Sequence, residues 1–257
     1  MLLSTDKILR KVSEVFLRRE HVSPDSKVIK HLDIGSGTGS LIESLSMLEP
    51  RIESAACNFT DEFAKTKNFH VDVVDLNVDG LPYNNNEFDF VTCTEVIEHL
   101  ENYRKCIREA YRVLRPGGVA IFTTPNVLSL KSRIRYFAIG FHALFGPLTV
   151  NRQGIEAHAS TGAHITPVSF FYLGHCFAES GFDDIELTID KIQTWALVWL
   201  IFLYPVIKVM GWYLAGRERR KKYINGSNSY LVRDINSIPM LLGRTIVVSC
   251  RKPDVST

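Results

Sequence analysis

The sequence predicts an α/β protein, with helices on both faces of a mostly parallel β-sheet. Segments with helical spacing of apolar residues alternate with short apolar runs typical of strands. The run Val119–Thr124 carries no charge, as expected for a strand buried on both faces. A glycine-rich turn at residues 35–39 follows an apolar strand, and in open α/β sheets ligands bind at the carboxyl ends of the strands.

The first half of the chain supplies two helices and three strands before that buried run. Apolar residues at positions 8, 12, 15 and 16 share one helical face, and those at 107, 110, 111 and 114 share another. The second helix is expected to stop at Pro116-Gly117-Gly118. Strands are expected at residues 31–34, 52–57 and 70–74.

The second half supplies one more helix and two strands. Thr166 followed by Pro167 is typical of an N-cap and a first-turn proline, and predicts a helix that closes at Gly181. Ile185–Ile189 and Thr245–Cys250 are the last two predicted strands.

Composition narrows the classes of partner and compartment. A chain of 257 residues with 46% apolar and 23% charged residues can bury a substantial core. The net charge of +2, without an arginine-lysine stripe, predicts no nucleic-acid partner. Five cysteines without a C-x-x-C pair predict buried reduced thiols and a cytoplasmic protein, and charged residues from Asp6 onward interrupt any signal-peptide pattern.

The glycine turn discriminates between cofactor classes. A dinucleotide site needs G-x-G-x-x-G, with the third glycine packing a helix closely. Counted from Gly35, that glycine would fall at position 40, where the chain has Ser40. The observed spacing is G-x-G-x-G, with Asp33 two residues before it. The pattern therefore disfavours a dinucleotide.

In this order, the turn and the motifs that follow resemble class I S-adenosylmethionine (SAM) dependent methyltransferases, and more distantly those of the ubiquinone pathway and of polysaccharide gene clusters. The resemblance covers about residues 30–127. It implies a Rossmann-like seven-stranded sheet whose last strand runs antiparallel between its neighbours, and SAM as the cofactor of a methyltransferase. The motifs after the turn are Leu81-Pro82-Tyr83, Phe88-Asp89-Phe90-Val91, Glu95-Val96-Ile97-Glu98-His99-Leu100, Arg112-Val113-Leu114-Arg115-Pro116-Gly117-Gly118 and Thr124-Pro125-Asn126.

The resemblance also assigns cofactor contacts. Asp33 would help place the cationic amino-acid portion of SAM, and Asp75 would hydrogen-bond the adenine amino group. Asn58 stands where the family usually has an acid that accepts both ribose hydroxyl protons, and its amide has one carbonyl acceptor and no charge, so a weaker ribose contact is expected. The remaining predicted contacts are Gly35, Ser36, Gly37, Leu76 and Thr94.

The candidate catalytic residues follow the fourth strand. A hydroxyl acceptor must lose a proton, and an imidazole with an ordinary pKa can take it, so His99 is the predicted general base, with Glu95 beside it. Alternatively, Glu95 and His99 cap or orient the cofactor loop. The resemblance to ubiquinone-pathway enzymes also leaves open a divalent ion on Glu95, Glu98 and His99, although no metal is assigned. His164 is a further candidate, and it and His158 are expected in loops.

Between the last two strands lies an apolar insertion that the fold does not need. Residues 195–216 are almost wholly apolar and are followed by the basic run 217–222. As one helix they would span about 33 Å, which is enough for a bilayer core. A single crossing is disfavoured, because the strands on either side belong to one sheet. A hairpin bent near Pro205, a helix in the membrane interface and a soluble lid remain.

The aromatic and basic residues of the insertion favour peripheral or monotopic membrane contact. A second basic amphipathic helix points the same way, with an apolar face over 130–144 (Leu130, Ile134, Phe137, Phe141, Leu144) opposite Lys131, Arg133 and Arg135, although a substrate-covering cap would share this pattern. We therefore expect a methyltransferase domain in 1–192 and 244–257, and a membrane-association element in 193–243.

The expected function is SAM-dependent O-methylation of a membrane-associated acceptor, such as a lipid-linked glycan or envelope intermediate, on the cytoplasmic face of the membrane. The acceptor would be a small or lipid-linked molecule. Two alternatives are kept: a quinone-type aromatic O-methyltransferase and a non-catalytic SAM-binding subunit.

Overall fold

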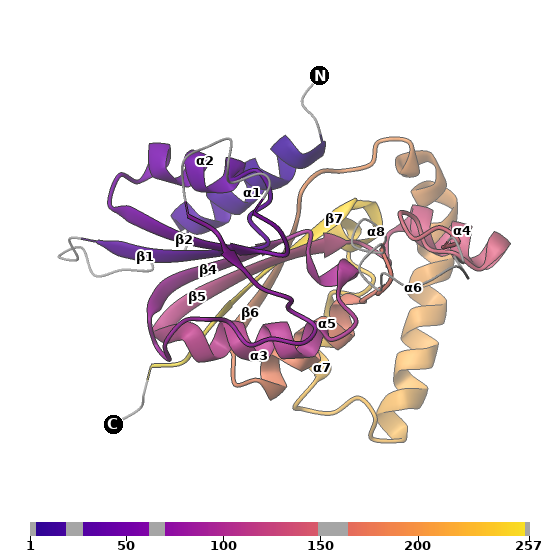
Figure 1. Cartoon of the computed structure of the whole chain (residues 1–257). Coiled ribbons are helices and arrows are strands. Elements are labelled where there is room, and N and C mark those ends of the chain that lie inside the picture. The colour runs from indigo at the N-terminus through magenta and orange to yellow at the C-terminus, as the bar shows by residue number, and fades with distance from the viewer. Residues whose placement is uncertain (1–3, 19–27, 62–69, 149–163, 255–257) are drawn as a thin grey trace, which may run out of the picture.

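A seven-stranded sheet forms the centre of the computed structural model, which describes residues 4–18, 28–61, 70–148 and 164–254 (Figure 1). The strand order is β3-β2-β1-β4-β5-β7-β6. Strands β1 to β5 are parallel, and β7 is antiparallel to both β5 and β6, as the sequence predicted. The strands are β1 Ile29–Ile34, β2 Ile52–Asn58, β3 Asp72–Val73, β4 Phe88–Thr94, β5 Leu114–Pro125, β6 Asp183–Ile189 and β7 Thr245–Arg251.

Helices cover both faces of the sheet (Figure 1). On one face α1 and α2 pack over a cluster that includes Phe90, Ile121 and Val247. On the other face α3 and α5 enclose a larger cluster that includes Phe122 and Phe177. Successive residues of β5 thus point to opposite cores. The helices are α1 Ser4–Arg18, α2 Ser40–Leu48, η2 Ile97–His99 (a single 3₁₀ turn), α3 Tyr103–Val113, α4 Leu130–Ile139, α5 Phe170–Glu179, α6 Ala196–Arg220, α7 Ser229–Arg233 and α8 Ile238–Leu242.

The predicted core faces are confirmed in the first two long helices. The apolar face of α1, with Ile8, Val12 and Val15, is almost fully buried, as are Ile107 and Ala110 of α3. Asn102 caps α3 by accepting a hydrogen bond from the backbone N–H of Lys105. All five cysteines are buried and free, as predicted.

Several predicted boundaries are wrong. The helix expected to stop at Pro116-Gly117-Gly118 ends at Val113, and those three residues already belong to β5. The helix expected to have Thr166 as its N-cap begins three residues later, with Ser169 as its N-cap residue. Thr166 instead donates its hydroxyl to the Leu100 carbonyl at 2.6 Å, so this side chain anchors the loop to the motif after β4. The strand expected at 70–74 is shorter, since only Asp72–Val73 pair with β2.

Helix α4 ends earlier than the predicted face at 130–144. Gly140 closes it in the left-handed conformation at φ 74°, which places Phe141 and Leu144 beyond the helix. Arg133 is not a surface base, because its guanidinium donates to the Leu128 and Ile235 carbonyls at 2.8 Å each. The exposed residues of α4 are Lys131 and the apolar or aromatic residues 136–139, and Phe137 is 93% exposed.

The apolar insertion forms one long helix, so the hairpin near Pro205, one of the three alternatives kept open, is excluded. Pro205 lies inside α6, where a proline costs one backbone hydrogen bond and can leave the helix unbroken. Of the described helices, α6 is the one long and apolar enough to cross a membrane, and none of its most apolar 18-residue window is buried.

Both ends of α6 return to the domain. Gln193, just before it, bonds to the Leu242 and Gly243 carbonyls, and α7 beyond it packs against α5. Helix α6 contacts α4 and α8 and runs along the edge of the molecule (Figure 1). The chain on both sides of α6 therefore belongs to the same domain.

Candidate functional site

Two neighbouring cavities open at the carboxyl edge of the parallel strands. The first, of about 210 Å³, is lined by residues that follow β2, β3 and β4, including Asn58, Asp75 and His99. The second, of about 290 Å³, lies against the glycine turn and α1. Gly35 and Glu95 line both cavities, so an elongated ligand could extend from one into the other.

The glycine turn needs glycine for two different reasons. Gly35 has φ 74°, and a Cβ there would lie 2.2 Å from Cγ2 of Val96, so this position permits close packing of the loop after β4. Gly37 has φ 50°, and a Cβ there would meet nothing within 4 Å. Left-handed backbone at both positions favours glycine and turns the chain sharply into α2.

Asp33 ends a buried chain of polar side chains that crosses three strands. Its Oδ1 accepts a hydrogen bond from Thr92 Oγ1 at 2.7 Å. The Thr92 hydroxyl also lies 2.8 Å from His31 Nε2, and His31 Nδ1 lies 2.9 Å from Ser54 Oγ. Because Thr92 donates to Asp33, His31 can donate from Nε2 and accept from Ser54.

Burial favours the neutral forms of both Asp33 and His31. It raises the pKa of Asp33 to about 7, against the opposing hydrogen bond from Thr92, and lowers the pKa of His31 to about 3. Asp33 lines the second cavity. A cation placed in that cavity would favour its charged form.

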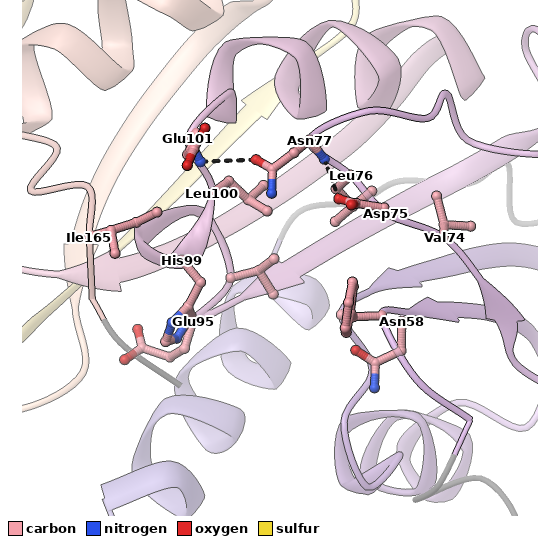
Figure 2. A pocket seen from close by; sticks show the side chains of 13 residues that line it. Asn58, Val74, Asp75, Leu76, Asn77, Glu95, His99, Leu100, Glu101 and Ile165 are labelled. Atoms are coloured by element: carbon pink, nitrogen blue, oxygen red, sulfur yellow. Dashed lines mark hydrogen bonds between the residues drawn. The ribbon is translucent and has the colours of Figure 1, made fainter. Parts of the chain in front are cut away.

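The predicted adenosine contacts line the first cavity (Figure 2). Asp75 Oδ1 accepts from the backbone N–H of Asn77 at 3.0 Å, and Asn77 Oδ1 accepts from the N–H of Glu101 at 2.9 Å. These bonds fix the loop after β3 against the loop after β4. Asn58 lies across the cavity from Glu95 and His99 in Figure 2.

Glu95 is the most constrained of the predicted site residues. It has φ 54°, which is uncommon for a residue other than glycine. The Thr123 hydroxyl accepts from the Glu95 backbone N–H at 3.0 Å and donates to its Oε1 at 3.1 Å. Burial raises the pKa of Glu95 to about 7, partly offset by Thr123 and by the nearby Arg244. A carboxyl group of this kind can exchange a proton near neutral pH.

The side chains that could bind a metal ion together are not the three that the sequence suggested. Glu98, His99 and His164 offer ligand atoms within 4.8 Å of one another, whereas the open alternative had placed Glu95 with Glu98 and His99. Glu98 is fully buried, and Thr124 donates to its Oε2 at 3.2 Å. Its Oε1 and His164 Nδ1 are buried without a hydrogen-bond partner among the described residues. A carboxylate with two imidazoles is a donor set that can hold a divalent transition metal.

His164 lies in a loop, as expected, with its ring centroid 4.9 Å from that of His99. His158 lies outside the described residues. The segment after 163 therefore reaches the motif that follows β4, a contact that spacing in the sequence did not predict.

Arg244 and Phe59 are site residues that the sequence analysis missed. Arg244 lines the second cavity, and Phe59 lines the first. Arg244 was predictable in principle, because an antiparallel strand begins at the edge where its parallel neighbours end. Phe59 directly follows Asn58 and carried no polar signal.

The segment that builds both cavities is similar to known methyltransferases. A family model described as a methyltransferase domain matches residues 32–122, the segment from β1 to β5 that builds both cavities. This segment, about a third of the chain, is therefore similar to a methyltransferase domain. The recognition made from the glycine turn and the motifs after it is confirmed.

Two curated relatives resemble the methyltransferase domain and its surroundings. A ubiquinone biosynthesis O-methyltransferase from Rickettsia conorii is 28% identical over 117 residues, covering 42% of this chain and 38% of the relative. A demethylmenaquinone methyltransferase from Corynebacterium urealyticum is 34% identical over 127 residues, covering 48% of this chain and 51% of the relative. The chain spans about half or less of the length of these relatives.

The whole fold resembles solved methyltransferase structures. A SAM-dependent methyltransferase from Archaeoglobus fulgidus superposes with a TM-score of 0.55 at 17% identity, covering 95% of this chain and 94% of that one. At this identity the likeness shows the fold alone.

The residues around the second cavity fit a polar ligand. Ser36 Oγ, Thr94 Oγ1 and Arg244 Nη1 are buried without hydrogen-bond partners among the described residues, and all three residues line that cavity. Buried polar atoms are costly unless paired, so these atoms are suited to a ligand with both donors and acceptors. The amino-acid portion of SAM has that chemistry.

Proposed function

We propose that this protein is a SAM-dependent methyltransferase that methylates a hydroxyl group of a membrane-associated acceptor. One observation carries the proposal: two cavities at the carboxyl edge meet at Gly35 and Glu95. One is lined by Asn58 and Asp75, and the other by Asp33 and the glycine turn. An adenosine group fits the first, and a methionine group fits the second.

The chain's own residues hold and orient the cofactor. Asp75 and Leu76 face the adenine, and Asn58 offers the ribose one carbonyl acceptor. Asp33 and Thr94 take the amino-acid portion beside the turn formed by Gly35, Ser36 and Gly37. When bound, SAM supplies a methyl group on a sulfonium centre, which is already activated for displacement.

Glu95 and His99 accept the proton that the acceptor hydroxyl loses. Both line the first cavity, and Glu95 also borders the second (Figure 2). A hydroxyl placed between them would meet a carboxylate whose pKa of about 7 suits proton transfer at neutral pH. The Thr123 hydroxyl keeps the Glu95 carboxylate in place through its hydrogen bond of 3.1 Å.

The acceptor is proposed to be reached at a membrane surface. Helix α6 leaves a long apolar surface exposed, with Trp199 and Trp212 among its exposed aromatic residues, and α4 adds Phe137. A monomer rarely exposes so much apolar surface without a partner. Arg217, Arg219 and Arg220 at the end of α6 suit the anionic cytoplasmic leaflet. We therefore place residues 193–243 on the inner face of the membrane and the methyltransferase domain beside it.

A quinone-type aromatic hydroxyl is the second candidate acceptor. The similarity to a ubiquinone biosynthesis O-methyltransferase and a demethylmenaquinone methyltransferase favours it. Such acceptors also reside in membranes, so the exposed surface of α6 serves either class.

Mass spectrometry of lipid extracts from cells with and without the gene would separate these functions. We expect one lipid-linked species to gain the mass of a CH₂ group when the gene is present. If the species is a glycan intermediate, the first proposal holds; if it is a polyprenylated aromatic compound, the second holds. Unchanged lipids, together with tight SAM binding, would contradict both and leave a non-catalytic SAM-binding subunit.

A further inference from the structure

The second cavity contains an acidic and a basic side chain that do not pair with each other. Asp33 has Thr92 as its hydrogen-bond donor, and Arg244 forms no ion pair within the described ranges, from 4–18 to 164–254. We propose that Arg244 binds the carboxylate of the cofactor's methionine portion, so that this cavity recognises a free α-amino-acid group. This inference rests on the proposed SAM cofactor and adds a specificity-determining residue outside the motifs.

The backbone of Arg244 is fixed from both sides. Its carbonyl accepts from the Asn126 N–H at 2.9 Å, and its own N–H donates to the Lys191 carbonyl at 3.3 Å. The preceding Gly243 carbonyl accepts from the side-chain amides of Asn126 at 3.0 Å and Gln193 at 3.1 Å. The ends of β5 and β6 thus hold the start of the Arg244 side chain at the cavity edge.

The head group of Arg244 has no hydrogen-bond or ion-pair partner in the part of the chain that the structure describes. Its Nη1 is buried and makes no hydrogen bond with the described residues. Glu95 and Asp190 are the acidic groups near it, and neither forms an ion pair with it among the described residues. Glu95 accepts from Thr123, and Asp190 accepts from the Thr245 N–H at 2.9 Å through Oδ1, while its Oδ2 is buried without a hydrogen-bond partner among those residues. A planar guanidinium with free donors binds carboxylates in two-point geometry, and leaving it buried and unpaired is costly.

The rest of the cavity complements an ammonium group. Asp33 offers a carboxylate, while Ser36 Oγ and Thr94 Oγ1 are buried hydroxyls with unused acceptor capacity. An α-amino acid carries one cation and one anion on the same carbon. The side chains of one cavity therefore match both charges of that group.

The position of Arg244 indicates that the carboxylate it binds belongs to the cofactor and not to the methyl acceptor. The cavity with Arg244 also contains Gly37 and Thr38 of the glycine turn, whereas His99 lines the other cavity. An acceptor approaching His99 would meet the cofactor's methyl group near Glu95, before it could reach Arg244.

Calorimetry with paired ligands tests this assignment in the full-length protein. S-adenosylhomocysteine and its decarboxylated analogue would be titrated into the wild type, Arg244→Gln and Arg244→Lys. We expect Arg244→Gln to lower the affinity for S-adenosylhomocysteine about 10- to 100-fold, the range for a hydrogen bond to a charged group. The decarboxylated analogue should bind the wild type and Arg244→Gln equally, and Arg244→Lys should recover part of the loss.

The control is Arg233→Gln, which removes a surface arginine paired with Asp234 and should leave both affinities unchanged. Equal losses for both ligands in Arg244→Gln would indicate a structural role and overturn the assignment, as would no loss for either. If Arg244→Gln does not fold, the wild type alone decides: equal affinity for the two ligands contradicts the assignment. Failure of the wild type to bind S-adenosylhomocysteine would instead overturn the proposed function.

Discussion

The strands β1 to β5 and helix α6, which lies between β6 and β7, are both rich in apolar residues, but the strands bury most of theirs and α6 leaves most of its own exposed. Phe90, Ile121 and Phe122 are fully buried, whereas Trp212 in α6 is 78% exposed. The methyltransferase match ends at residue 122, so it includes the first region and stops before the second. The apolar residues of the strands therefore form the core beneath the proposed cofactor site, whereas those of α6 form an exposed surface.

Replacing Glu95 should have the largest effect of these changes, and it should reduce methyl transfer without altering membrane contact. Glu95→Gln removes the carboxylate that accepts the acceptor's proton, and we expect turnover to fall about 100- to 10,000-fold. SAM affinity should stay nearly constant, and wild-type turnover should rise with pH to a plateau above about 7, where Glu95 is ionised. Rates of methyl transfer from labelled SAM measure this.

His99→Ala is the companion variant, because both side chains line the same cavity. Glu53→Gln, an exposed position on β2, is the matched control and should retain full turnover. Full activity in both Glu95→Gln and His99→Ala would remove these residues from proton transfer.

Charge reversal at the end of α6 should abolish membrane contact while sparing SAM binding. Each basic residue near an anionic surface contributes about 1 kcal/mol, so reversing Arg219, Arg220 and Lys222 to glutamate should weaken binding to phosphatidylserine-containing vesicles by more than about 100-fold. Sedimentation with vesicles gives the bound fraction. Reversing Arg10 and Lys11 on α1 is the control. A wild type that stays wholly in the supernatant would contradict the membrane proposal.

Asp33→Asn should raise stability while it weakens cofactor binding. In the folded state Asp33 keeps its proton up to a pKa of about 7, whereas the unfolded chain loses it near 3.8. Wild-type stability therefore falls as pH rises from about 4 to about 7. Above that window the variant should be more stable by on the order of 2–4 kcal/mol, and the difference should vanish below about pH 4. Urea unfolding at several pH values measures it, and a pH-independent difference would contradict the burial argument.

Thr92→Val should have the smallest effect. It removes the hydrogen bond to Asp33 and the acceptor for His31 Nε2 without changing volume much. The lost bond to Asp33 is worth about 1 kcal/mol, or roughly fivefold in SAM affinity. Because Thr92 lowers the pKa of Asp33, the pH midpoint of SAM binding should move upward in the variant. A purely structural role would lower affinity at every pH and leave the midpoint in place.

The residues near each position in the sequence predicted the site around β1 to β5 well and the course of the segment between β6 and β7 poorly. The turn at Gly35 and Gly37 and the loop after β4 are set by backbone conformation and by neighbouring side chains, which a sequence displays directly. The meeting of Arg244 and His164 with that loop depends on contacts between distant segments. Thr166 looked like a helix cap, but its hydroxyl is used by the Leu100 carbonyl.

Pro205 was the residue of the insertion that most clearly suggested a bend, but α6 continues through it. A proline marks a break only where the neighbouring residues do not continue the helix, and the apolar residues on both sides of it do. What determines the course of α6 is its packing against α4 and α8, which the residues of α6 alone do not encode.

Titration of SAM into the wild-type protein and Asp33→Ala by calorimetry tests the central claim most directly. We predict micromolar binding to the wild type and at least about a tenfold loss in the variant, because Asp33 lines the second cavity, where the proposed site would hold the amino-acid portion of the cofactor. No binding to the wild type, or equal binding to both proteins, would contradict the assignment of this site to SAM.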